Sequence, residues 1–280
     1  MNLRVLDRSP LANIAGPSLV KILITLICAM IIPTFTSGDE LSREEREKFL
    51  KSAKVISIEE VGEGATRPFK LRLESGTLKM KAIYKTVDLR LKSPTRFGTE
   101  TVPEYLDSYK CEIAAYELDK LLGLNLLPVT VERRIKGKRG SVREWVDRIV
   151  PHYGHSEPLP DMDLVQDQLH TVWLFDYLIY NLDRRTHNLM IGPGWSPVLI
   201  DHSMTFSTFE RPFKPLHRFP KEVIQHLRDL KFSTIRKTLG PYLKRHQLKA
   251  FMRRRQIVLQ IVDQQIEKRG ESEVLFPTPN

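Results

Sequence analysis

The sequence predicts an α+β fold of two lobes: a β-rich N-terminal lobe with one main helix, then a mostly helical C-terminal lobe. From Val55 to Val87, short runs alternate apolar and polar residues, which is typical of half-buried strands. Beyond residue 160, apolar residues recur at three- and four-residue steps, which favours helices. The intervening segment 151–160 contains three prolines and is the expected linker. We therefore expect an N-terminal lobe at 39–150 and a C-terminal lobe at 161–280.

Residues 1–38 predict a signal peptide or signal anchor. An apolar run at 22–35 follows basic residues and precedes small ones, which is the order of an export signal. The run is short for a membrane-spanning helix, which needs about 20 apolar residues. We expect an exported or membrane-anchored protein of the secretory pathway. An anchor that leaves the rest of the chain facing the cytoplasm stays open, because the charges flanking the run are mixed.

The N-terminal lobe is expected to hold strands joined by short turns. The turn signals are Gly62 with Gly64 and the pair at 75–76. The main helix is expected at Pro103–Leu122, with Gly123 as its stop, after a polar connection around Arg90. A short charged helix is expected before the first strand. The expected strands are Val55–Ile58, Phe69–Leu73, Leu78–Lys85, Val129–Arg134 and Val142–Val150.

The C-terminal lobe is expected to begin with a buried helix that leads into a polar loop at Asp183. A short apolar run, Val198–Ile200, reads as a strand that ends at Asp201. Two later helices are expected near 221–231 and 248–268.

The composition limits the classes of partner that the protein is expected to bind. The net charge of +10 and a pI near 9.6 favour anions, among them nucleotide phosphates, acidic proteins and anionic lipids. Aromatic residues are not interleaved with the basic runs, which argues against a nucleic-acid partner. The two cysteines, Cys28 and Cys111, are not expected to pair, and they cannot form a zinc site alone.

Three oxygen-bearing side chains in the second lobe predict phosphoryl transfer from ATP. Asp183 is followed five residues later by Asn188 and thirteen beyond that by Asp201. In this chemistry one carboxylate accepts the proton of the acceptor hydroxyl, while an amide oxygen and a second carboxylate hold a divalent metal on the phosphates. The alternative is that Asp183 and Asn188 are ordinary turn residues after a helix.

The first lobe offers candidates for the nucleotide side of such a site. Lys85 closes a strand, as the phosphate-binding lysine of kinases does, and Glu112 in the main helix would be its ion-pair partner. Lys70 on the neighbouring strand is expected to point into the same cleft, and the Gly62 and Gly64 turn to approach the phosphates. The alternatives are solvated lysines, and Glu117 as a rival partner in the same helix.

Two segments resemble the atypical kinases of the secretory pathway, the group that includes the Golgi casein kinase and the xylosyl kinase of proteoglycan synthesis. They are Lys110–Gly123, followed by Pro128, and Leu178–Arg184. The resemblance extends from about Gly62 to Phe206 and implies a two-lobed protein-kinase-like fold with ATP between the lobes. It also implies Mg or Mn as the metal, which suits an all-oxygen site.

The same resemblance assigns roles residue by residue. It matches Asp183 to the catalytic base, Asp201 to the metal aspartate, Glu112 to the helix glutamate, and Lys70 and Lys85 to the nucleotide-side lysines.

The chain also departs from this group. Its members in animals carry several disulfides, and their metal segment usually reads Asp-Asn-Gly where this chain has Asp201-His202-Ser203. The position of Asn188 is closer to phosphoinositide 4-kinases and HipA-type kinases. The substrate is therefore not carried over.

The leading hypothesis is an ATP-dependent kinase that phosphorylates a hydroxyl of a protein, glycan or lipid, with an acidic acceptor favoured by the basic charge. The alternative is a catalytically inactive pseudokinase or scaffold of the same fold, which binds nucleotide or a partner kinase. The residue His202 in the metal segment motivates this alternative.

Overall fold

The computed structural model describes most of the chain beyond residue 40. The predicted signal or anchor segment (1–38), the predicted linker (151–160) and Gly64 lie outside the described residues. None of the described helices is both long enough and apolar enough to cross a bilayer. The described residues are 41–62, 67–91, 94–97, 100–102, 105–147, 161–192 and 195–278.

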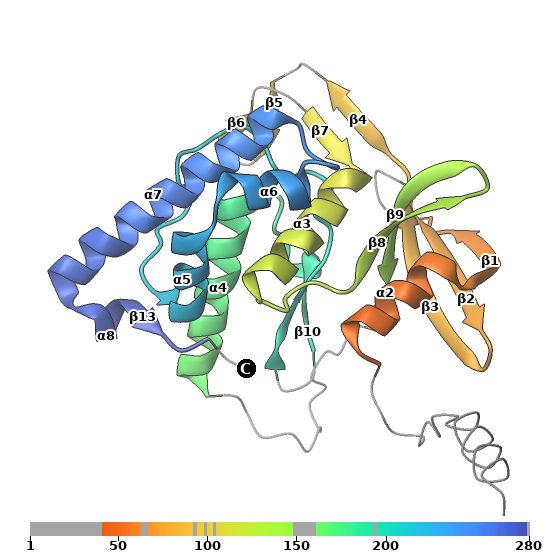
Figure 1. Cartoon of the computed structure of the whole chain (residues 1–280), viewed down its shortest axis with the longest axis horizontal. Coiled ribbons are helices and arrows are strands. Elements are labelled where there is room, and N and C mark those ends of the chain that lie inside the picture. Colours follow the sequence, from red (N-terminus) through yellow and green to blue (C-terminus); the bar gives the residue numbers. More distant parts are fainter. Residues whose placement is uncertain are drawn as a thin grey trace, which may run out of the picture. The chain divides into compact units, whose positions relative to one another are not determined.

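The N-terminal lobe is built on a five-stranded antiparallel sheet in the order β1-β2-β3-β9-β8 (Figure 1). The alternation predicted for β2 is confirmed, since Leu71 and Leu73 are buried while Arg72 between them is exposed. Helix α2 (Arg43–Ser52) contacts β8 and β9. The strands are β1 (Lys54–Glu60), β2 (Phe69–Ser75), β3 (Leu78–Lys85), β8 (Thr130–Ile135) and β9 (Lys138–Glu144).

The segment between β3 and the main helix differs from the prediction. Strand β4 (Asp88–Leu91) pairs with β7 (Tyr105–Ser108), where the sequence predicted a polar connection and the start of a helix. Helix α3 begins only at Tyr109 and ends at Leu122, because Ser108 is extended and its Oγ accepts a hydrogen bond from the backbone N–H of Lys110. A second small pair joins β5 (Thr95–Phe97) to β6 (Glu100–Val102).

The C-terminal lobe is mostly helical, as predicted. Helix α4 (Met162–Ile179) leads into the Asp183 loop, and β10 (Leu189–Ile191) pairs with β11 (Pro197–Leu199) beyond it. The helices predicted near 221–231 and 248–268 are confirmed, whereas α6 was not predicted. The remaining elements are the 3₁₀ turn η1 (Thr186–Asn188), β12 (Phe219–Pro220), α5 (Lys221–Asp229), α6 (Phe232–Leu239), α7 (Arg245–Arg269), α8 (Glu271–Val274) and β13 (Leu275–Phe276).

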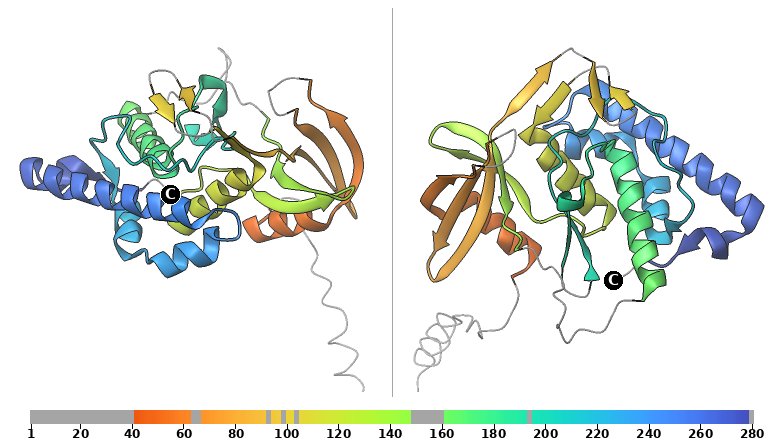
Figure 2. Two further views of the ribbon diagram at one scale, coloured as in Figure 1. Left: turned by 90° about the horizontal axis from the view of Figure 1, so that it is seen from above. Right: turned by 180° about the vertical axis from the view of Figure 1, so that it is seen from behind.

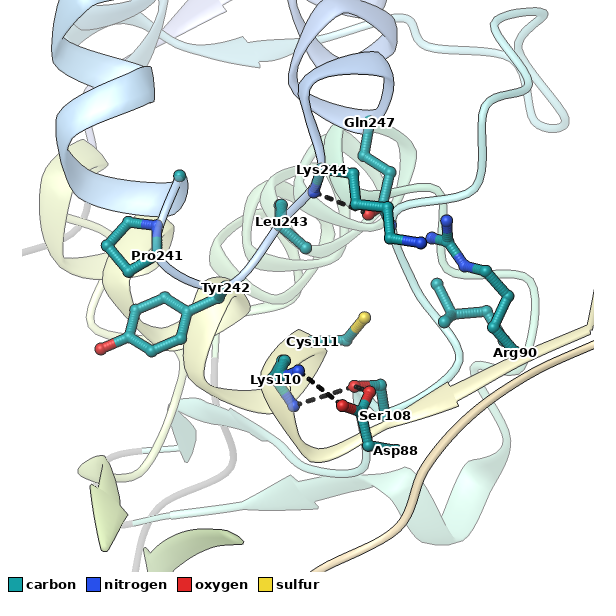
Figure 3. Close-up of a pocket in the computed structure, with 12 residues that line it drawn as sticks. Asp88, Arg90, Ser108, Lys110, Cys111, Pro241, Tyr242, Leu243, Lys244 and Gln247 are labelled. Atoms are coloured by element: carbon teal, nitrogen blue, oxygen red, sulfur yellow. Dashed lines mark hydrogen bonds and ion pairs between the residues drawn. The ribbon is translucent and has the colours of Figure 1, made fainter. Parts of the chain in front are cut away.

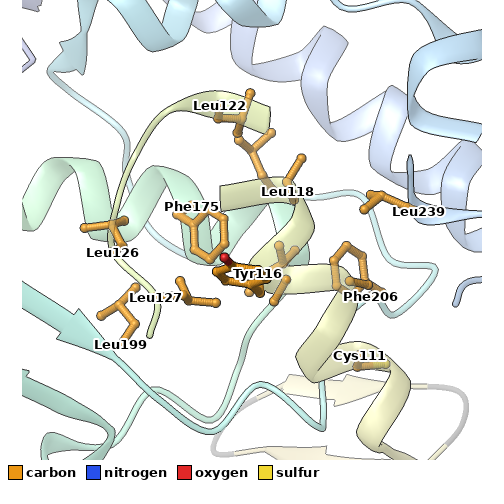
Figure 4. Close-up of a cluster of buried hydrophobic side chains, with 14 of the residues drawn as sticks. Cys111, Tyr116, Leu118, Leu122, Leu126, Leu127, Phe175, Leu199, Phe206 and Leu239 are labelled. Carbon is orange, nitrogen blue, oxygen red and sulfur yellow. The ribbon is translucent and has the colours of Figure 1, made fainter. Parts of the chain in front are cut away.

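Helix α3 joins the two lobes. It contacts β8 and β9 on one side and α5 and α6 on the other (Figure 2). Its fully buried Tyr116 belongs to the hydrophobic core together with Phe175 of α4 and Phe206 (Figure 4). Gly123 ends the helix in the left-handed conformation, with φ of 68°, as its position predicted. The side chains of α3 are therefore fixed relative to both lobes.

The C-terminal lobe also contains a fully buried arginine, Arg254 of α7. Its Nε donates to the carbonyl of Leu178 at 2.9 Å, and its Nη1 donates to the carbonyls of Ser207 at 2.9 Å and Phe209 at 2.7 Å. The guanidinium also lies over the ring of Tyr180, 5.4 Å from its centre. Arg254 thus ties the end of α4 to the segment that follows Phe206.

Candidate active site

The loop that carries Asp183 is anchored on a buried carboxylate of α4. Asp176 accepts two hydrogen bonds from Arg184, from Nε at 3.0 Å and from Nη2 at 2.9 Å, and one from Asn181 Nδ2 at 2.9 Å. The Asp176 side chain is 3% exposed and that of Arg184 9%. A bidentate arginine–carboxylate pair has a fixed geometry, so the residues on either side of Asp183 are held in place.

The same guanidinium joins this loop to the Asp201 segment. Arg184 Nη1 donates to the carbonyls of Asn188 at 2.6 Å and Ile200 at 3.1 Å, and Nη2 donates to His202 Nε2 at 2.9 Å. Burial and the charge of Arg184 lower the pKa of His202 well below its usual value. The imidazole is therefore neutral and free to accept this bond. His202 thus helps to position the backbone beside Asp201.

Asp183 and Asn188 lie next to each other. Asn188 is 3% exposed, and its Nδ2 donates to the backbone carbonyl of Asp183 at 3.3 Å. This contact uses the amide nitrogen and leaves the amide oxygen as the group that could bind a metal. The Asp183 carboxylate accepts a hydrogen bond from Nε of the exposed Arg185 at 2.7 Å.

Lys85 links the two lobes electrostatically. Its Nζ lies 2.5 Å from Oε1 of Glu112 in α3 and 2.7 Å from Oδ1 of Asp201. Burial favours the neutral amine, but the two carboxylates outweigh it and raise the pKa of Lys85. For Glu112, burial is likewise outweighed by Lys85 and Arg143, so its pKa is lowered. The rival Glu117 instead pairs with Lys120 on the same helix, at 3.2 Å.

The other nucleotide-side residues are less closely tied to this cluster. Lys70 lies on β2 opposite Ile83, and its Nζ sits 4.6 Å from the centre of the Trp145 ring. Gly62 follows β1, and a Cβ added there would meet no described atom within 4 Å. Packing against the described residues therefore does not require glycine at this position. Its phosphate-binding role stays a prediction, as does that of Gly64.

Asp107 of β7 is a site residue that the sequence analysis missed. It is 3% exposed, and Oδ2 accepts a bond from the Tyr105 hydroxyl at 3.3 Å. Burial raises the pKa of Asp107, which the Ser203 hydroxyl and Lys85 oppose and Asp201 reinforces. The charges of Lys85 and Asp201 therefore both act on the Asp107 carboxylate. The available signal was Ser108, a helix-capping residue type immediately before α3.

Arg143 of β9 was also missed. It lies opposite Ile83 in the sheet, and Ile83 lies opposite Lys70 on the other side. Because side chains two residues apart share a face, Lys85 is on this face as well. Burial lowers the pKa of Arg143, while Glu112 and Asp201 oppose that change. Lys70, Lys85 and Arg143 thus lie on one face of the sheet, next to the acidic groups of α3 and the Asp201 segment.

The donor set fits a divalent metal that completes its shell with phosphate oxygens. Asp107, Asn188 and Asp201 offer oxygen ligands, which Mg and Mn prefer. Asp107 is buried, and within the described residues its carboxylate is bonded by neutral hydroxyl groups, which leaves its charge to attract a cation. No group of three or more His, Cys, Asp or Glu side chains in the described residues could hold a metal alone. This is expected where an amide and a nucleotide supply the remaining ligands.

Comparison with known proteins places the fold. Neither a protein-family model nor a curated protein matches the sequence. Among solved structures, hydra Fam20 with sugar is similar with a TM-score of 0.62 at 16% identity, covering 86% of this chain and 94% of that one. The Golgi casein kinase gives 0.58 at 16% identity, covering 86% and 80%, and its form with Mn/ADP bound gives 0.57 at 16%, covering 85% and 80%. The two-lobed kinase-like fold predicted from the sequence is therefore confirmed, and this chain shares the fold of the Fam20 and Golgi casein kinases.

Proposed function

We propose that the protein is an ATP-dependent kinase that uses Mg or Mn to phosphorylate a hydroxyl group. The observation that carries this proposal is the contact of Lys85 with both Glu112 and Asp201. The lysine is thereby shared between the helix that joins the lobes and the candidate metal aspartate. A kinase needs its lysine paired with the helix glutamate and its metal aspartate beside the same phosphates, and this arrangement brings those three groups together.

Each residue has a defined part in the proposed reaction. Asp183 accepts the proton of the acceptor hydroxyl. Lys85, together with Arg143 and Lys70 on the same sheet face, binds the phosphates. Asp201, Asn188 and Asp107 would hold the metal, which neutralises charge on the phosphates. The Golgi casein kinase structure with Mn/ADP bound supports this choice of metal and nucleotide.

We propose a protein or glycan as the acceptor, with a lipid as the further candidate. The sugar in the hydra Fam20 structure supports a glycan, and the net charge of +10 favours acidic acceptors. Export through the secretory pathway, or membrane attachment through residues 1–38, stays a prediction. Reporter fusions at either end of the chain test the orientation.

The direct test is ATP turnover by the purified protein with Mn or Mg. We expect Asp183→Ala and Asp201→Ala each to lower turnover by at least about a hundredfold, with retained folding by circular dichroism. Asp263→Ala is the matched control, because this exposed aspartate of α7 pairs with Arg228, away from the candidate active site. Turnover that survives in Asp201→Ala would overturn the assignment of the metal ligand.

The second candidate function is a pseudokinase, which the residue after Asp201 favours. His202 is buried and follows the candidate metal aspartate, where the atypical kinases that the chain resembles usually have asparagine. In this case ATP and metal should raise the melting temperature without being consumed. Turnover by the unmodified protein would exclude this function.

A further inference from the structure

The two edge strands of the N-terminal sheet border a common gap. Strands β1 and β8 are the edges of the sheet, and within the described structure they do not pair with each other. A cavity of about 410 Å³ between them is lined by residues 55–58 of β1 and by residues 133–136 of β8 and its turn. Because successive side chains of a strand point to opposite faces, a cavity lined by consecutive residues runs along the backbone edge of the strand. The gap therefore lies between two backbone edges.

The directions of these two strands suit one additional strand. Each neighbouring pair in the sheet is antiparallel, so β1 and β8 run in the same direction after four such pairs. A strand placed between them is therefore antiparallel to both, which continues the alternation around the sheet. Four residues on each side correspond to about 13 Å of extended chain. The gap thus matches a short extended peptide bound by strand addition.

The side chain of Arg133 fixes one end of the gap. Its Nη1 donates to the carbonyl of Leu50 at 3.0 Å, and its Nη2 donates to that of Ala53 at 2.5 Å. Leu50 belongs to α2, and Ala53 directly precedes β1. Arg133 therefore ties β8 to the start of β1. The two edges are held apart before any peptide binds, and such preorganisation lowers the cost of binding.

Strand β1 also carries an exposed apolar side chain beside the gap. Ile56 is 50% exposed. It is the extra residue of a bulge, because its neighbours Val55 and Ser57 lie opposite adjacent residues of β2. An exposed edge strand with an apolar side chain is a template for pairing with another chain.

The charge of the lining indicates which peptides the gap favours. Arg133, Arg134 and Lys136 are cationic, and none of the described lining residues is acidic. Arg134 Nη1 donates to the carbonyl of Gly137 at 2.8 Å, and this neutral partner leaves the charge of the guanidinium to attract an acidic peptide.

The cavity of about 500 Å³ between β7 and the turn that joins α6 to α7 is lined differently (Figure 3). There Asp88 accepts bonds from Lys110 Nζ at 2.5 Å and from Ser108 Oγ at 2.7 Å. Arg90 Nη1 lies 3.2 Å from Nε2 of His246. These charged groups are bonded within the protein, whereas the gap between β1 and β8 is bordered by the edges of two strands.

We propose that the gap between β1 and β8 binds an extended acidic segment of a partner protein, which adds as an antiparallel strand to both edges. Main-chain hydrogen bonds supply the affinity, and the acidic side chains of the segment pair with the cations of β8 and its turn. The proposal is independent of the proposed kinase function, because the gap is lined by none of the candidate active-site residues.

Fluorescence anisotropy on the full chain tests the proposal with a labelled seven-residue peptide of alternating glutamate and valine. The peptide has no hydroxyl side chain, so it cannot serve as a phosphate acceptor. We expect saturable binding that weakens by about tenfold or more when lysine replaces glutamate in the peptide. Methylation of the valine amides, which removes the donors along one edge of the peptide, should weaken binding by about tenfold as well.

Variants of the protein locate the binding. Ile56→Asp and Arg134→Glu should each weaken binding of the acidic peptide by about tenfold, because both place a negative charge beside it. Both residues are exposed, so folding should be retained. Arg139→Glu is the matched control, because Arg139 is exposed and lies opposite Arg134 in the same hairpin but does not line the gap. Lys70→Met tests for binding at the candidate active site and should leave the affinity unchanged.

Hydrogen exchange distinguishes strand addition from a loose electrostatic contact. We expect the acidic peptide to slow the exchange of backbone amides within 55–58 and 133–136. Binding that leaves the exchange of both segments unchanged would contradict strand addition.

Three results would overturn the site. They are no preference for the acidic peptide over the lysine peptide, equal losses in Arg134→Glu and Arg139→Glu, and binding lost in Lys70→Met. A lack of any binding would show that the bulge and the charges only protect the exposed edges. Self-association of the protein without peptide, detected by sedimentation and abolished in Ile56→Asp, would identify a second copy of the chain as the occupant instead.

Discussion

The two sides of the candidate active site are built differently. On the C-terminal side, a single side chain, that of Arg184, contacts Asp176, the backbone of Asn188 and Ile200, and His202. On the N-terminal side, Gly62 meets no described atom at its Cβ position. The groups proposed to do the chemistry are therefore rigidly positioned, whereas the described start of the glycine turn has few constraints. From this contrast we predict which substitutions should have the largest effects on stability and turnover.

The largest effect is expected for Arg184→Ala. It leaves the buried carboxylate of Asp176 without its two arginine bonds, and removing one partner of a buried ion pair costs about 3–5 kcal/mol. Chemical denaturation should show this loss of unfolding free energy, and turnover should fall as well. The neighbour Arg185→Ala is the control, because Arg185 is exposed and its pair with Asp183 should contribute less than about 1 kcal/mol. Similar losses in both variants would contradict the anchoring role of Arg184.

A smaller but more specific effect is expected for Asp107→Asn. The amide retains an oxygen but loses the charge proposed to attract the metal, so the Mn concentration for half-maximal turnover should rise about tenfold or more. Folding stability should stay the same or increase, because a buried carboxylate is replaced by a neutral group. Tyr105→Phe, which removes only the hydroxyl bonded to Asp107, serves for comparison. An unchanged Mn requirement in Asp107→Asn would remove Asp107 from the metal site.

A second buried acid, Asp119, lies near the C-terminal end of α3, whereas Asp107 precedes the N-terminal end of this helix. Asp119 is fully buried, accepts a bond from the backbone N–H of Leu126 at 2.8 Å, and burial raises its pKa to about 7. Between the ordinary carboxyl value and about 7, the folded protein retains a proton that the unfolded chain has lost. The free energy of unfolding should therefore fall as the pH rises through this range, and then level off.

Asp119→Asn should flatten this part of the stability profile by up to a few kcal/mol, since one pKa unit is worth about 1.4 kcal/mol. Denaturation at pH 5 and pH 8 measures it. An equal pH dependence in Asp119→Asn and the unmodified protein would show that another group titrates.

The smallest effect is expected for Gly62→Ala. The residue is exposed and its added methyl group would meet no described atom within 4 Å, so turnover and ATP affinity should change by less than about threefold. A loss of ATP affinity beyond tenfold would instead show that the backbone at Gly62 must approach the phosphates, as the sequence predicted.

The sequence predicted those parts of the fold that depend on local patterns. The alternation in β2 and in the first half of β3 is local, and so are the turn at Gly76 and the end of α3 at Gly123. The alternation predicted for the second half of β3 is wrong, because residues 82–85 are all buried. The start of α3 was predicted six residues early because Leu106 continues its apolar spacing. Leu106 instead pairs with Arg90, and that contact between distant segments is not encoded in the spacing.

The residues of the candidate active site also fall into two groups, those that local spacing predicts and those that only distant strand pairing brings together. The candidates Asp183, Asn188 and Asp201 could be proposed from their short spacing, and the structure places their segments together. Asp107 and Arg143 come near the other site residues only through the pairing of β7 with β4 and of β9 with β3. No spacing rule links either residue to Lys85, and the capping residue Ser108 indicates where α3 begins but not that Asp107 lies near Lys85.

Arg254 has a consequence for the synthesis of the protein. It donates to the carbonyl of Leu178, 76 positions upstream, at the point where the chain turns toward Asp183. During translation, the two segments that this guanidinium connects are made long before it emerges from the ribosome. We therefore expect nascent chains that stop short of residue 254 to be sensitive to proteases around residue 180, and this sensitivity to disappear once α7 is released.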